Sequence, residues 1–288
     1  MLNTYVTEIT GDGRHVTGAR IFSRDRDAGT FVADYYVPCT GGLENSRLLL
    51  WSNERSRGAV VPHAAALGRY WMEHPQFLGG DAILTDLSAF PTDSTHEAFF
   101  SPSPAAMEAR QILNFGIRLI ETPYGGVKQV IADLACYAPD FAEWAADQLG
   151  QHLRCASQLY VGWEQAPLES NHIRLSQYER DRAGVPRIEL HWQKSPLERR
   201  TIREGLRLFG ETLAARDIGR VRLAEWMTND DDYPTDQELA GHHHMGGTRM
   251  SDDPARGVVD RDCKVHGIDN LYVGGSSVFA TSGQCNPT

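Results

Sequence analysis

The sequence predicts an α+β fold in which a sheet-rich middle is inserted between two glycine-rich ends. Three observations predict it. Apolar and polar residues alternate over short stretches, as in half-buried strands. One long stretch, 196–215, has the spacing of an amphipathic helix. Glycines cluster at 41–42 and 274–275, near the two ends of the chain. The length of 288 residues corresponds to about two domains of ordinary size.

The chain is expected to begin with a β-hairpin. Residues 5–10 and 15–22 alternate as strands do, and Gly11-Asp12-Gly13 between them is a turn signal. These glycines do not indicate a dinucleotide-binding motif, because the third glycine and the following helix are absent. We expect a third strand at residues 31–37 and then a helix at residues 43–51.

The middle of the chain is predicted to be rich in short strands. Residues 62–130 contain strand-like runs without a helical period, whereas residues 141–155 are expected to form a helix. Residues 173–175 and 188–192 alternate with period two, which predicts two half-buried strands.

The helix at 196–215 is the most clearly predicted element. Ser195 can cap it, Pro196 suits its first position, and Glu198 completes a capping box. Its apolar residues then repeat at helical spacing and predict one buried stripe, made of Ile202, Leu206, Phe209 and Leu213.

Composition excludes several classes of function. The net charge of -10 argues against non-specific nucleic-acid binding and against a polybasic membrane patch. No apolar run approaches the roughly 18 residues of a membrane span. The 5 cysteines are widely spaced and contain no CxxC pair, which favours reduced thiols and a cytoplasmic location over disulfides or a zinc ribbon.

The C-terminal tail has a different character from the rest of the chain. Three consecutive histidines, 242–244, precede a glycine-rich stretch. Residues 270–273 are expected to form a short strand that ends in Gly274-Gly275-Ser276-Ser277. Glycines and hydroxyls at the carboxyl end of a strand suit a phosphate or a ribityl chain.

These motifs resemble a known family, the glucose–methanol–choline (GMC) flavoprotein oxidoreductases. In the tail the resemblance rests on HHMGGTRM, VVD, VHG, NLYV and the closing NPT. Further forward it rests on GGLENSRLLL, on LGRYWMEHP, and on EQAP followed by IRLS. The pattern is most similar to the branch of bacterial sugar and polyol dehydrogenases and pyranose-oxidase-like enzymes.

The resemblance implies oxidation of an alcohol by FAD. Residue by residue, it makes His243 the active-site base and Asn286 its partner. Hydride loss from an alcohol leaves a hydroxyl proton, and an imidazole is suited to accept it near neutral pH. An amide N–H can hold the developing alkoxide without competing for that proton. No side chain accepts a hydride, so a cofactor is required, and the resemblance makes the N5 atom of FAD the acceptor.

Without the family resemblance, the histidines allow other interpretations. A solvated turn or a zinc site is the usual alternative for such a run. On a strand, however, His243 would point away from His242 and His244, so the three would not converge on one ion. We therefore expect no metal.

The resemblance also suggests which residues contact FAD. The contacts at the adenine end are Val6, Thr40, Gly41, Gly42 and Glu44, and those at the flavin end are Gly275, Ser276, Asn286 and Pro287.

The resemblance divides the chain into two domains. Residues 1–62 and 238–288 would form part of an FAD-binding, Rossmann-like domain. Residues 63–237 would form an inserted substrate-binding domain built on an antiparallel sheet flanked by helices. The family's GxGxxG unit has no counterpart here, so about 200 or more amino-terminal residues would be missing. The family's final helix has no counterpart either, and we expect the chain alone to bind FAD weakly or not at all and to be inactive.

The expected partners are a small alcohol or sugar and an unidentified electron acceptor or oxygen. The alternative is a noncatalytic remnant, or a subunit that gives the substrate face to a separate flavin-binding chain.

Overall fold

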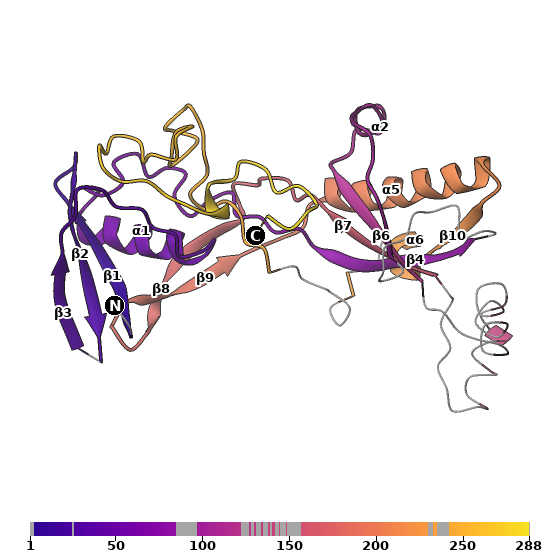
Figure 1. Ribbon diagram of the computed structural model, residues 1–288, viewed down its shortest axis with the longest axis horizontal. Coiled ribbons are helices and arrows are strands. Elements are labelled where there is room, and N and C mark those ends of the chain that lie inside the picture. The colour runs from indigo at the N-terminus through magenta and orange to yellow at the C-terminus, as the bar shows by residue number, and fades with distance from the viewer. Residues whose placement is uncertain are drawn as a thin grey trace.

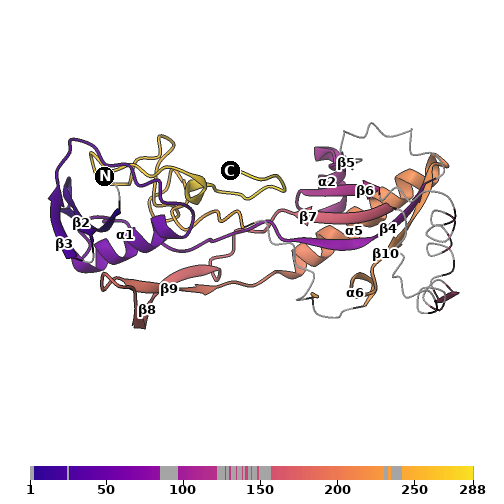
Figure 2. The same ribbon diagram turned by 60° about the horizontal axis from the view of Figure 1, so that its bottom comes forward.

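The computed structural model describes residues 3–24, 26–84, 97–121, 157–229, 233–234 and 242–287, with a few separate positions between 127 and 148. The molecule is elongated, and its two ends carry different sheets (Figures 1 and 2). A three-stranded sheet with helix α1 lies at one end, and a five-stranded sheet with helix α5 lies at the other.

The three-stranded sheet is an antiparallel meander in the order β1-β2-β3. It contains β1 (Thr4–Gly11), β2 (Val16–Ser23) and β3 (Arg26–Phe31). The predicted hairpin is confirmed, and Asp12 closes its turn by accepting the backbone N–H groups of Arg14 and His15.

The third strand lies earlier than predicted, at Arg26–Phe31 instead of residues 31–37. The apolar segment after it leaves the sheet and pairs with the C-terminal tail. Tyr36 forms an isolated parallel bridge with Leu271, in which its N–H donates to the carbonyl of Asn270 over 2.9 Å. Residues 31–37 have a strand-like pattern, but the segment that pairs with Tyr36 lies more than 200 residues further along the chain.

Helix α1 (Glu44–Arg55) confirms the predicted helix and packs on β1. The backbone N–H of Ile9 donates to Ser52 Oγ over 2.8 Å, which joins the strand to the helix. The tail packs on the same core, where Leu271 and Val273 are buried. The predicted strand at 270–273 is present only as isolated bridges.

A long hairpin, β8 (His172–Arg180) with β9 (Pro186–His191), confirms the two strands predicted in this region. It contacts α1, and Arg47 makes the strongest link: its guanidinium donates to Asp181 over 2.6 Å and to the carbonyl of Pro186 over 2.7 Å.

The second sheet has five antiparallel strands in the order β10-β4-β7-β6-β5. Its strands are β4 (Gln76–Leu84), β5 (Glu97–Phe100), β6 (Phe115–Glu121), β7 (Ser157–Trp163) and β10 (Gly219–Leu223).

Helix α5 (Pro196–Ala215) packs on this sheet and confirms the prediction for 196–215. Its capping box is formed by Ser195 and Glu198, and all four residues of the predicted stripe are buried. Three shorter helices complete the described elements: α2 (Pro104–Arg110), α6 (Glu225–Thr228) and the 3-10 helix η2 (Ser276–Val278).

The prediction for 62–130 missed α2. This helix has only seven residues, too few to show a period, although Ser103 caps it and Gln111 ends it in a left-handed conformation. The predicted helix at 141–155 falls largely outside the described residues. Within the described part of the chain, no helix is long and apolar enough to cross a membrane.

The two sheets have separate hydrophobic cores. One core draws on residues 9–67 and 258–278, and the other on residues 77–227. The predicted boundary at 238 falls between these groups, whereas Ala66 and Leu67, which lie beyond the predicted boundary at 62, still belong to the first core. The hairpin β8–β9, from the predicted substrate-binding domain, packs on α1.

Candidate active site

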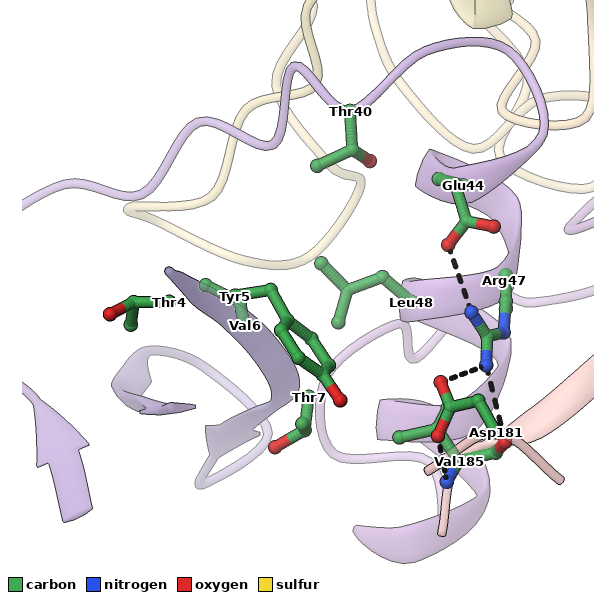
Figure 3. A pocket seen from close by; sticks show the side chains of 10 residues that line it. All are labelled: Thr4, Tyr5, Val6, Thr7, Thr40, Glu44, Arg47, Leu48, Asp181 and Val185. Carbon is green, nitrogen blue, oxygen red and sulfur yellow. Dashed lines mark hydrogen bonds and ion pairs between the residues drawn. The ribbon is translucent and has the colours of Figure 1, made fainter. Parts of the chain in front are cut away.

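Four of the predicted site residues line two cavities. We call the first the β1–α1 cavity; it has a volume of about 440 Å³. Figure 3 shows three of the predicted FAD contacts around it, namely Val6 on β1, Thr40 in the loop before α1, and Glu44 at the start of α1. The other lining residues are Thr4, Tyr5, Thr7, Arg47, Leu48, Asp181 and Val185.

An ion-pair chain forms one wall of the β1–α1 cavity. Arg47 contacts Glu44 over 3.2 Å and Asp181 over 2.6 Å (Figure 3). Burial alone would raise the pKa of the Asp181 carboxyl, but hydrogen bonds from Arg47 and from two backbone N–H groups hold that pKa below its ordinary value. The wall therefore keeps Asp181 charged and fixed against Arg47.

Tyr5 supplies an unsatisfied polar group among the lining residues. Its hydroxyl is buried and has no hydrogen-bond partner among the residues that the structure describes. A buried hydroxyl without a partner is costly, so a polar ligand in the β1–α1 cavity would find a group able to bind it.

The two glycines before α1 have different roles. Gly41 has a φ of +95°, and a Cβ there would meet open space. A Cβ on Gly42, in contrast, would lie 2.2 Å from the carbonyl oxygen of His244. Gly42 therefore allows the loop before α1 to touch the backbone of the histidine run.

The histidine run is not a strand, contrary to the expectation. His242 has a φ of +52°, a left-handed conformation that breaks the extended backbone. The rings of the other two still point to different neighbours. His243 contacts His74, and His244 lies 5.6 Å from Trp71 between ring centroids. Among the described residues, no group of three metal-ligating side chains comes together.

His74 and His243 form a close pair. Their Nε2 and Nδ1 atoms lie 2.9 Å apart, and the ring planes differ by 16° with centroids 4.8 Å apart. Burial, with a further contribution from the neighbouring His243, lowers the pKa of His74 to about 4. His74 is therefore a neutral imidazole at physiological pH. Sequence reasoning assigned His74 no chemical role, although it lies in the MEHP motif.

His244 is perturbed in the same direction. Burial is the main cause that lowers its pKa, His242 and His243 add to the effect, and Glu73 opposes it.

The second cavity, which we call the β6–tail cavity, has a volume of about 600 Å³. His74 and the exposed Asn286 both line it, and His243 adjoins it through its hydrogen bond to His74. The other lining residues are Gln76, Glu97, Phe99, Phe100, Ser101, Gly116, Ile117, Arg118, Gly162, Gln284 and Cys285.

Gly116 sets how the tail lies on the sheet in this cavity. A Cβ on Gly116 would be 2.2 Å from Oε1 of Gln284, so this side chain occupies the space that the glycine leaves. Gln284 also donates to Ser101 Oγ over 3.3 Å. These contacts hold the segment that carries Asn286 against β6.

Only some of the residues predicted to contact the flavin end of FAD are free to bind a ligand. Gly275 has a φ of +95° and faces open space, as a backbone that approaches a ligand does. Ser276, however, donates its hydroxyl to the carbonyl of His244 over 2.7 Å, so this group is committed within the chain. Pro287 is half-buried, next to Asn286.

Asn45 was missed by sequence reasoning. It is fully buried, and its Oδ1 accepts from the N–H and the hydroxyl of Thr40. Its Nδ2 donates to the carbonyl of Gly274 and to Ser277 Oγ, both over 2.9 Å. Asn45 thus joins the loop at the β1–α1 cavity to the glycine loop of the tail. The only sequence signal was its place in the GGLEN motif.

The family model and the curated relatives that match this chain are all oxidoreductases. Residues 167–288 match the family model described as GMC oxidoreductase. The chain is 20% identical to the fructose dehydrogenase large subunit of Gluconobacter japonicus, over 99% of this chain and 49% of that protein. It is 23% identical to 2-methyl-1,2-propanediol dehydrogenase of Mycolicibacterium austroafricanum, over 99% of this chain and 48% of that protein.

Solved structures show the same fold. Pyridoxine 4-oxidase from Mesorbium loti superposes with a TM-score of 0.57 at 18% identity, over 98% of this chain and 53% of that one. A formate oxidase superposes with a TM-score of 0.52 at 18% identity, over 98% and 57%. The chain therefore spans about half the length of the proteins it matches.

Proposed function

Since residues 167–288 match the family model described as GMC oxidoreductase, we propose that the chain forms the substrate side of an FAD-dependent active site. The reaction proposed is oxidation of the CH–OH group of a small alcohol, a sugar or a polyol. One observation carries this proposal: His74, which is hydrogen-bonded to His243, and Asn286 both line the β6–tail cavity. The names of the dehydrogenase relatives support this class of substrate.

In this proposal His243 is the base and Asn286 the alkoxide partner. The imidazole accepts the hydroxyl proton of the bound alcohol, as histidine can near neutral pH. The Asn286 amide donates to the same oxygen and stabilises the charge that develops there. FAD, when bound, supplies the hydride acceptor.

The residues of the β1–α1 cavity would hold the adenosine end of FAD. Val6 offers an apolar contact, and Thr40 and Glu44 offer oxygen atoms to polar groups of the ligand. The unpartnered Tyr5 hydroxyl supports a polar ligand here. Gly275 offers a backbone that a ribityl chain or a phosphate can approach closely. The committed hydroxyl of Ser276 would support this loop without binding the cofactor.

Anaerobic reduction of the flavin tests the proposal. The flavoprotein that contains this chain is mixed with a panel of sugars, polyols and simple alcohols, and flavin absorbance is followed. His243→Ala and Asn286→Ala are each expected to slow reduction by about 10²–10⁴-fold, the usual contribution of a general base or of an oxyanion donor. His242→Asn is the matched control, because His242 is exposed and asparagine tolerates its left-handed backbone.

Two outcomes would refute the assignment. If both alanine variants reduced the flavin at the wild-type rate, the two residues would not be the base and its partner. If no alcohol on the panel reduced the flavin, the proposed substrate class would be wrong. Oxygen uptake, compared with reduction of an artificial acceptor, then identifies the electron acceptor.

A further inference from the structure

The His74–His243 pair has the geometry of a hydrogen bond between ring edges. Nε2 of His74 and Nδ1 of His243 lie 2.9 Å apart, which is within hydrogen-bond distance, and the ring planes differ by 16°. In such a bond one ring is the donor and the other the acceptor. One proton lies between Nε2 of His74 and Nδ1 of His243. Which of these two nitrogens carries it decides which nitrogen of His243 can act as a base.

The surroundings of His74 indicate that its Nε2 is the acceptor. The ring is buried, with 3% of its surface exposed. Burial disfavours its charged form, so it carries one proton. A hydrogen bond between the ring and its own backbone acts in the opposite direction and raises the pKa, as expected if a ring N–H donates there. Since Nε2 faces His243, that N–H is on Nδ1, and Nε2 carries a lone pair.

We propose that His74 is a positioning residue that accepts the Nδ1–H of His243 and thereby leaves Nε2 of His243 unprotonated to take the alcohol proton. The inference rests on the proposed role of His243 as the base. In the described part of the chain, Nε2 of His243 makes no hydrogen bond, as this role requires. With the opposite arrangement, His243 would carry its proton on Nε2 and could not act.

The tautomer of His243 tests the proposal directly. In free histidine the neutral ring prefers the proton on Nε2, so a predominant Nδ1–H form needs a specific acceptor. Long-range ¹⁵N–¹H correlation spectra of the ¹⁵N-labelled chain distinguish protonated from unprotonated ring nitrogens. We expect His243 to be mainly Nδ1–H in the wild type, and the signals are assigned by their loss in His243→Gln.

Three variants separate the acceptor from simple packing. His74→Phe keeps a ring of similar size but removes the acceptor, and we expect the ratio of Nδ1–H to Nε2–H in His243 to fall by about tenfold, the equivalent of one hydrogen bond. His74→Gln keeps an amide oxygen near the position of Nε2 and should restore the ratio. His172→Gln disturbs the other stacked pair, His172 with His191, and should leave His243 unchanged.

A wild-type His243 that is mainly Nε2–H would overturn the proposal, even if no variant folded. An unchanged tautomer in folded His74→Phe would overturn it as well. Failure of the proposed function is distinguishable, because it appears as normal flavin reduction by His243→Ala whatever the tautomer. In the flavoprotein, His74→Phe should slow reduction by about tenfold, and His74→Gln should recover most of the rate.

Discussion

The contact of Gly42 with the histidine run makes a sharp prediction about stability. In Gly42→Ala the new methyl carbon would lie 2.2 Å from the carbonyl oxygen of His244, 2.6 Å from its Cβ and 2.7 Å from its carbonyl carbon. Atoms this close must move apart. Most of the obstacle is backbone, and the same carbonyl accepts the Ser276 hydroxyl, so the histidine run cannot yield without loss of that bond.

Overpacking of this kind costs about 1–3 kcal/mol, and we expect Gly42→Ala near the upper end because two backbone segments must separate. The matched control is Gly162→Ala, on β7 in the β6–tail cavity. There the Cβ would meet its nearest atoms at 3.8 and 3.9 Å, which is ordinary contact. Gly42 and Gly162 both lack a positive φ, so alanine fits either backbone and the pair isolates the clash.

Urea unfolding of the chain, followed by tryptophan fluorescence and by circular dichroism, measures the difference. Gly42→Ala should unfold at a clearly lower urea concentration with an unchanged slope, whereas Gly162→Ala should stay within about 0.5 kcal/mol of the wild type. If the two variants were equally stable, Gly42 would not be the close contact described, and its role in joining α1 to the histidine run would be refuted.

Three further predictions concern single side chains. Leu206→Ala, in the stripe of α5, should cost about 2–5 kcal/mol in unfolding experiments because the side chain is fully buried, whereas Leu197→Ala, which is 38% exposed on the same helix, should cost under about 1 kcal/mol; equal costs would contradict the packing of α5. Arg47→Lys should destabilise by about 1–2 kcal/mol in thermal unfolding, because an ammonium cannot reproduce the fork that holds Asp181 and the β9 carbonyl, and an unchanged midpoint would show that the fork is not needed. His74, whose pKa is lowered to about 4, is protonated more readily unfolded than folded, so its contribution of about 3 kcal/mol is present above pH 6.5 and lost as pH falls toward 4. Wild-type stability should therefore fall more steeply over that window than the stability of His74→Gln, and parallel pH curves would contradict this.

Elements with local causes could be predicted from the sequence. The turn between β1 and β2 depends on Asp12, which bonds residues two and three positions away. Helix α5 depends on a cap and a stripe that lie within its own 20 residues. In both cases the residues that form the element are neighbours in the chain, so the local sequence pattern is enough to predict it.

Elements that depend on distant partners could not be predicted. The segment around Tyr36 has a strand-like pattern, yet the tail, not β2, supplies its hydrogen-bond partners. The contact of His74 with His243 was hidden for the same reason, since the two residues are 169 positions apart in the chain. Motif resemblance indicated that these segments matter, but only the fold shows which atoms meet.

The candidate site also depends on residues that are distant from one another in the sequence. Resemblance placed Thr40 near one end of a dinucleotide and His243 near the other, as two separate sets of contacts. The structure connects the sets through the loop before α1: Asn45 holds both Thr40 and the carbonyl of Gly274, and Gly42 rests on the residue after His243. In the proposed site, the spacing between the cofactor contacts and the base therefore depends on this loop and on the buried Asn45. A substitution at Asn45 should accordingly disturb both cavities together, whereas one at Glu44 should disturb the β1–α1 cavity alone.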